Sequence, residues 1–275
     1  MNRRISFVSL CLLVLISCAP EPTEAPVPTE TITPTDTPPA TATNPPAIST
    51  EPQRIEFSAE DGAALVGYHY PAPASNSPVV VLMHWALGDQ TDWKNVGMVD
   101  WLTHKNREGF ADEFPSIPYA VFTFDFRGFG ESGGQFNPAG WVMDAKSAYQ
   151  IAMGLPGVDP ARVVGIGSSI GADAVVDSCG TICKGALSLS PGGYLNIPYD
   201  QAVATFNDAS DRPSILCIAS EGDRESAPAC QSASGEHYQS IMYPGSLHGT
   251  EFLMPNPMRL EFTRTISDWL ASVFP

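Results

Sequence analysis

Short apolar runs alternate with longer amphipathic stretches along residues 53–275. The strongest run, Pro78–His84 (PVVVLMH), is continuous, which is typical of a strand buried on both faces of a parallel sheet. Similar runs predict seven further strands: Arg54–Ser58, Ala64–Tyr70, Tyr119–Phe124, Arg162–Gly167, Gly185–Leu189, Ser214–Ala219 and Tyr238–Tyr243. Helical stretches lie between them: Asp92–Lys105, Trp141–Met153, the residues after Ser169, and Pro257–Val273. This alternation predicts an α/β fold, with a mainly parallel sheet of about eight strands and helices on both faces.

Two connections refine this prediction. Asp61-Gly62 lies between the first two runs and is a turn signal, so these runs predict an opening hairpin. Only the 24 residues of Ser190–Pro213 separate two later strands, which is too few for a separate cap domain. We therefore expect an open cleft.

The first eighteen residues have the pattern of an export signal. Arg3 and Arg4 precede a short, mostly apolar run that ends at Ser17. Leu15–Cys18 (LISC) resembles the lipobox of bacterial lipoproteins, in which the cysteine is diacylated and becomes the mature N-terminus. The alternative is an ordinary cleaved signal in which Cys18 has no role. The first interpretation predicts a lipoprotein of the cell envelope, in contact with the membrane only through this anchor.

Residues 19–52 have a different composition from the rest of the chain. Ten of these 34 residues are proline and nine are threonine, with five acids and no base. Such a segment cannot bury enough apolar surface to offset the entropy lost on ordering. We expect a solvated linker here and a single folded domain at residues 53–275.

The charge of the chain excludes one class of partner. Thirty acids against fourteen bases give a net charge of −16, whereas nucleic-acid binding needs a basic surface. The cysteines contain no CxxC or Cys-His spacing that suggests zinc. No spacing in the chain implies a metal or an organic cofactor.

Four cysteines remain in the predicted domain, and an even number in an exported chain favours disulfides. Four cysteines allow three pairings. Short spacing favours Cys179 with Cys183 and Cys217 with Cys230. The alternative is that some of them stay buried as free thiols.

Gly167-Ser168-Ser169-Ile170-Gly171 matches the pattern G-x-S-x-G. Glycines allow a strand to turn sharply into a helix, which leaves the central serine exposed at the helix N-terminus. The segment VVGIG before the motif reads as a strand and IGADAVVD after it reads as a helix. The context therefore favours Ser169 as a nucleophile over a simple strand-to-helix turn.

A second motif, Asp125–Ser132 (DFRGFGES), is similar to the D-x-R-G-x-G-x-S loop of many α/β-hydrolases. With both motifs at their usual separation, residues 53–275 resemble the α/β-hydrolase family over essentially their whole length. In that family this loop is structural, so we expect Asp125 and Arg127 to order the loop as a pair and to take no part in proton transfer.

The resemblance implies a triad in the chain order Ser, acid, His. His248 follows the last predicted strand, as the catalytic histidine of the family does. The other histidines precede Ser169 or lie at the wrong strand end: His69, His84, His104 and His237. Asp223 follows a glycine after the penultimate strand, where the family presents its acid, and Glu221 is the second candidate.

The resemblance also implies two backbone donors for the oxyanion. One is the N–H of Ile170, just after the nucleophile, and the other is the N–H of Ala86 in the loop after Pro78–His84. Family members commonly have His-Gly in that loop, whereas this chain has His84-Trp85. Trp85 either lines the acyl pocket or is a buried core residue.

These residues predict a serine hydrolase of carboxylic esters with a small-molecule substrate. Relatives similar to dienelactone hydrolase share this minimal architecture but use cysteine where this chain has Ser169. One alternative is a peptidase similar to prolyl oligopeptidases, although the usual propeller is absent. Another is a non-catalytic surface-binding lipoprotein on a hydrolase scaffold.

Overall fold

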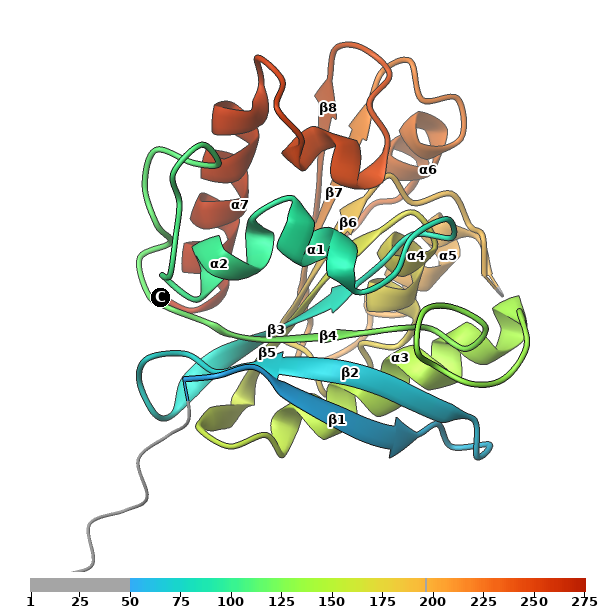
Figure 1. Cartoon of the computed structure of the whole chain (residues 1–275). Coiled ribbons are helices and arrows are strands. Elements are labelled where there is room, and N and C mark those ends of the chain that lie inside the picture. Colours follow the sequence, from blue (N-terminus) through green and yellow to red (C-terminus); the bar gives the residue numbers. More distant parts are fainter. Residues whose placement is uncertain (1–49, 196) are drawn as a thin grey trace, which may run out of the picture. The chain divides into compact units, whose positions relative to one another are not determined.

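The computed structural model describes residues 50–195 and 197–275, in which one eight-stranded sheet forms the centre (Figure 1). Its strands are β1 (Gln53–Ser58), β2 (Ala64–Tyr70), β3 (Ser77–Met83), β4 (Ala120–Phe124), β5 (Val158–Ser168), β6 (Gly185–Leu189), β7 (Ser214–Ser220) and β8 (Tyr238–Tyr243). Their spatial order is β1-β2-β4-β3-β5-β6-β7-β8. The pairs β1–β2 and β2–β4 are antiparallel and all the others are parallel. The predicted α/β class and mainly parallel sheet are confirmed.

The predicted export signal, its Cys18 and the predicted linker up to Ser49 lie outside the described residues. Within the described ranges, no helix has the length and apolar character needed to cross a membrane.

Helices pack on both faces of the sheet, as predicted. They are α1 (Thr91–Asn95), α2 (Met98–Leu102), α3 (Pro138–Met153), α4 (Ile170–Asp177), α5 (Tyr199–Ala204), α6 (Ser226–Ser232) and α7 (Arg259–Val273), with a 3₁₀ helix, η1 (Gly249–Leu253). Residues of β3 alternate between the faces: Val79 and Val81 share a core with α3 to α6, whereas Val80 shares one with α1, α2 and α7. All of Val79–Met83 is fully buried, which explains the continuous apolar run of this strand.

The predicted helix Asp92–Lys105 is wrong in one respect, because the structure divides it into α1 and α2. Gly97 separates the two helices with a φ of +96°, a left-handed conformation that ends a helix. The break lets Trp93 and Trp101 both be fully buried in the same core. Packing against the sheet therefore determines the path of this segment.

The two predicted connections are confirmed. β1 and β2 form the opening hairpin, in which Ser58 pairs with Ala64. Between Ser190 and Pro213 the described residues form one short helix, α5, and no cap domain. Within the described residues, this connection therefore places no cap domain over the carboxyl edge of the sheet.

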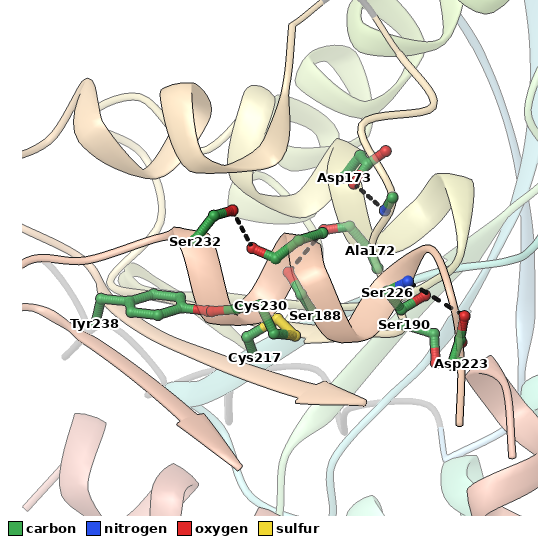
Figure 2. Close-up of a disulfide and its surroundings, with 12 residues drawn as sticks. Ala172, Asp173, Ser188, Ser190, Cys217, Asp223, Ser226, Cys230, Ser232 and Tyr238 are labelled. Carbon is green, nitrogen blue, oxygen red and sulfur yellow. Dashed lines mark hydrogen bonds between the residues drawn. A yellow bond between two sulfur atoms is a disulfide. The ribbon is translucent and has the colours of Figure 1, made fainter. Parts of the chain in front are cut away.

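The four cysteines pair as their spacing favours. Cys179 and Cys183 have a Cα–Cα separation of 5.0 Å, and Cys217 and Cys230 have one of 5.7 Å, both within the range of disulfides. The second bridge ties β7 to α6, the helix that follows Asp223 (Figure 2). It therefore fixes the element next to the predicted acid.

Asp125 and Arg127 both order the loop after β4, but they do not pair with each other among the described residues, so the predicted pair is wrong. The Asp125 carboxylate accepts the backbone N–H groups of Gln90 and Glu131, each at 2.8 Å. The Arg127 guanidinium is buried and donates to Asp144 at 2.7 Å. It also bonds Asp61, from the β1–β2 turn, at 2.8 Å. This ion-pair network joins the hairpin, the loop and α3.

Candidate active site

Ser169 lies at the turn from β5 into α4 and has an unusual backbone conformation. Its φ is 55° and its ψ is −114°, a region that residues other than glycine rarely adopt. Its N–H donates to the carbonyl oxygen of Leu189 at 2.9 Å, which anchors the turn to β6. The conformation places Ser169 at the N-terminus of α4, as predicted for the central serine of the motif. The residue is only 8% exposed, so the predicted exposure of this serine is wrong, because the loop after His248 packs against the turn.

The two glycines of the motif are needed because other backbone approaches them closely. A Cβ atom on Gly167 would lie 1.9 Å from the carbonyl oxygen of Gly171. A Cβ atom on Gly171 would lie 2.2 Å from the carbonyl oxygen of Met83, at the end of β3. Side chains at these positions would separate α4 from β5 and β3. The packing of this turn therefore requires both glycines of the motif.

His248 and Asp223 are brought together by the ends of β8 and β7. The Nδ1 atom of His248 lies 2.7 Å from Oδ2 of Asp223. Burial opposes ionisation of Asp223, but its hydrogen bonds with His248 and Ser226 outweigh that effect and lower the pKa of its carboxyl. Asp223 is therefore ionised at neutral pH and bonds the imidazole of His248.

The residues after His248 lie against the nucleophile turn. Gly249 N–H donates to Ser190 Oγ at 2.9 Å, and Thr250 N–H donates to Ser168 Oγ at 3.1 Å. A Cβ atom on Gly249 would lie 3.9 Å from the backbone nitrogen of Ser169. The loop that carries His248 is thus fixed beside Ser169.

Ser168 and Ser190 are supporting residues that the sequence analysis did not identify. Both are fully buried, and each bonds a residue at least 59 positions away. No local pattern marks such long-range partners. Ser190 also has a positive φ of 58°, but this feature is known only from the structure.

The two predicted oxyanion donors come from adjacent elements. Ile170 is the first residue of α4, whose N-terminus favours negative charge. Ala86 follows β3, which packs against the first turn of α4 at Gly171. Among the described residues, no hydrogen bond within the protein uses the backbone N–H of Ile170 or Ala86. Within the described part of the chain, both N–H groups are therefore unpaired.

His84 holds the loop that contains Ala86. It is fully buried, with Nδ1 2.7 Å from the carbonyl oxygen of Trp85 and Nε2 3.0 Å from the N–H of Phe126. Burial lowers the pKa of His84 to about 4, so the ring is neutral and can donate at one nitrogen and accept at the other. His84 therefore joins the loops after β3 and β4, a role that its sequence position did not reveal.

Trp85 is not the buried core residue that was one of the two interpretations considered for it. It is only partly buried, and its indole Nε1 donates to the carboxylate of Asp92 at 2.8 Å. This bond ties the loop after β3 to α1. The departure from His-Gly is thus compensated by a tryptophan that holds the loop in place.

Asp173 is a further buried carboxyl near the nucleophile, one turn along α4. Its oxygens accept the N–H of Gly192 at 3.1 Å and the N–H of Tyr194, both in the loop after β6. Burial raises the pKa of Asp173 to about 6, although these hydrogen bonds oppose the shift. Asp173 therefore orders the loop that also carries Ser190.

The other candidates for acid and base lie apart from this arrangement. His237 precedes β8, and its Nε2 lies 3.2 Å from the carbonyl oxygen of Val203. Glu221 is exposed to solvent, whereas Asp223 contacts His248. The geometry therefore favours Asp223 and His248 over the two alternatives.

Comparison with known proteins finds relatives without an assigned activity. No family model matches the chain. The uncharacterized protein YfhR of Escherichia coli K12 is 32% identical over 133 residues, which cover 46% of this chain and 42% of YfhR. The uncharacterized protein Rv2307c of Mycobacterium tuberculosis is 26% identical over 226 residues, covering 74% of this chain and 75% of that protein. The matches span between 38% and 53% of the YfhR proteins.

Solved structures match over most of the chain. The esterase Pf2001 of Pyrococcus furiosus has a TM-score of 0.60 at 17% identity, covering 84% of this chain and 98% of that one. An esterase of Pyrobaculum calidifontis has a TM-score of 0.58 at 18% identity, covering 81% and 84%. The chain has the α/β-hydrolase fold. In this chain the ends of β5, β7 and β8 carry Ser169, Asp223 and His248.

Proposed function

We propose that this protein is a serine hydrolase that cleaves carboxylic esters through an acyl-enzyme. One observation carries the proposal: Asp223 bonds His248 at 2.7 Å, and the loop after His248 packs against the strained Ser169 turn. A nucleophile, a base and an orienting carboxylate in this chain order are what acyl transfer requires. The description of the matched Pyrococcus and Pyrobaculum proteins as esterases supports an ester substrate.

The chemistry follows from these roles. Ser169 Oγ attacks the ester carbonyl carbon while His248 Nε2 takes the hydroxyl proton. The N–H groups of Ala86 and Ile170 bind the oxyanion that forms. When the carbon–oxygen bond to the alcohol breaks, His248 returns the proton to the leaving oxygen. Water, deprotonated by His248, then hydrolyses the acyl-enzyme and releases the carboxylic acid and free Ser169.

The test is ester turnover together with its inhibition. We expect the purified protein to hydrolyse p-nitrophenyl acetate, and we expect a fluorophosphonate to abolish that activity by modifying Ser169. Turnover of a p-nitroanilide amide at a comparable rate would instead favour the peptidase interpretation. Absence of turnover and of labelling would favour a non-catalytic binding protein.

We also propose that the domain is an extracytoplasmic lipoprotein of the cell envelope, anchored through Cys18. The support is the basic start, the apolar run and the LISC sequence, followed by the proline- and threonine-rich segment. Cys18→Ala is expected to release the protein from the membrane fraction. Mass spectrometry of the mature N-terminus provides the check, since an N-terminus without lipid in the wild type would contradict the proposal.

A further inference from the structure

Large exposed apolar side chains on the described part of the molecule occur at four positions. They are Leu87, 83% exposed, Phe136, 62% exposed, Met254, 48% exposed, and Leu260, 41% exposed. The two most exposed, Leu87 and Phe136, come from the loops after β3 and β4, which are neighbouring strands. Leu87 also directly follows Ala86, the predicted oxyanion donor. The most exposed apolar surface is therefore associated with the loops around the candidate active site.

A chain of contacts joins this surface to the nucleophile. A Cβ atom on Gly171 would lie 2.8 Å from the carbonyl oxygen of His84, which precedes the loop that carries Leu87. The ring of His84 contacts the ring of Phe129 with centroids 5.2 Å apart. Phe129 in turn contacts Phe136 at 5.7 Å. The apolar side chains thus lie on the β3–β4 side of the turn that carries Ser169.

Asp223 and His248 lie on the other side of that turn. β4 and β3 are on one side of β5, whereas β7 and β8, which carry Asp223 and His248, are on the other (Figure 1). Since His248 must protonate the leaving oxygen, the alcohol part of an ester has to face β7 and β8. The acyl group then extends in the opposite direction, toward Leu87 and Phe136.

The charges agree with this orientation. Three exposed acidic residues lie in the segments after β7 and β8 that carry Asp223 and His248: Glu221, Glu225 and Glu251. On the other side, the exposed Glu131 of the loop after β4 pairs with Arg54 at 2.9 Å, so its charge is balanced. An apolar chain gains nothing from lying over exposed carboxylates, whereas it removes apolar surface from water over Leu87 and Phe136. The β3–β4 side is therefore the favourable place for an apolar acyl group.

We infer that the substrates are esters of apolar, medium-chain carboxylic acids, and that Leu87, Phe129 and Phe136 form the surface that binds the acyl chain. This inference rests on the proposed esterase function. Burial of one methylene group increases binding by about fourfold, so several methylenes of the acyl chain produce a large preference even when burial is incomplete.

The test compares p-nitrophenyl hexanoate with p-nitrophenyl acetate, as the ratio of their kcat/KM values. We expect a wild-type ratio of about ten or more, and a loss of about threefold or more in Leu87→Ser and in Phe136→Ser. Phe136→Leu, which keeps an apolar side chain, is expected to restore most of the ratio. Leu260→Ser, at an exposed position in the first turn of α7, is the matched control and is expected to leave the ratio unchanged.

The outcomes separate this inference from the proposed function. Two outcomes would overturn the acyl surface while leaving an esterase. One is hydrolysis of both esters by the wild type with a kcat/KM ratio near one. The other is a ratio that is equal in Leu87→Ser, Phe136→Ser and wild type. A protein that hydrolyses neither ester would overturn the esterase function, and the acyl surface with it. A ratio that falls in Phe136→Ser and returns in Phe136→Leu supports the inference.

Discussion

Replacement of Ser169 or His248 by alanine is expected to lower kcat by a factor on the order of 10⁶, the loss typical of removing the nucleophile or base of a serine hydrolase. The two residues serve one step, the transfer of the Ser169 proton during attack on the carbonyl. Each single change already disables that step. The double variant is therefore expected to lose little more than either single variant, whereas independent roles would multiply the two losses.

Asp223→Asn tests the third member of the triad. The neutral amide of asparagine cannot stabilise the positive charge that forms on the His248 imidazole, as the Asp223 carboxylate does. Ser169 and His248 both remain. A loss on the order of 10⁴ in kcat is expected. His104→Ala, which changes a histidine whose Nε2 lies 2.9 Å from the carbonyl oxygen of Pro115, is the control and is expected to retain activity. Full activity in Asp223→Asn would contradict the role given to Asp223.

Among the substitutions proposed here, Asp144→Ala is expected to cause the largest decrease in the free energy of unfolding. Asp144 is fully buried and bonds both the guanidinium and the backbone N–H of Arg127. Without it, the buried Arg127 keeps Asp61 alone as an ion-pair partner among the described residues, and Asp61 is partly exposed. Breaking a buried ion pair in this way costs about 3–5 kcal/mol in the free energy of unfolding. In a domain of this size that corresponds to a fall in Tm of roughly 6–20 °C.

Thermal unfolding followed by circular dichroism measures this loss, with Lys146→Ala as the matched control on the same helix. Lys146 pairs with Glu60 at 2.8 Å, but both side chains are about half exposed. Such exposed pairs contribute about 0–1 kcal/mol, so the control is expected to unfold close to wild type. Equal Tm values for Asp144→Ala and wild type would contradict the role given to the network.

The strands and the turn were predictable because their signals are local. The continuous run of β3 follows from burial on both faces, and the G-x-S-x-G pattern follows from backbone contacts that exclude side chains at Gly167 and Gly171. The contact between Asp223 and His248 was predictable because the chain order of strand ends sets which residues meet at one edge of a parallel sheet. The strands and the turn are each encoded by a few neighbouring residues, whereas the chain order is read over the whole domain.

The supporting contacts were not predictable, because they join residues far apart in the chain. Ser168 bonds Thr250 and Ser190 bonds Gly249, across 82 and 59 positions. The partners of Arg127 were misjudged for the same reason, since Asp61 lies 66 positions away and was assigned only to a turn. The division of α1 from α2 at Gly97 depends on the packing of Trp93 and Trp101 against the sheet, and helical periodicity alone does not contain it.

The most direct test of the central claim is the site at which a fluorophosphonate reacts. Ser168 and Ser169 are adjacent, but the Ser168 hydroxyl is fully buried and accepts the N–H of Thr250, whereas Ser169 occupies the turn beside the loop of His248. Peptide mapping by mass spectrometry is expected to find one adduct, on Ser169, that forms in step with the loss of ester turnover and is absent from Ser169→Ala. An adduct on Ser168, or full turnover by the labelled protein, would contradict the account.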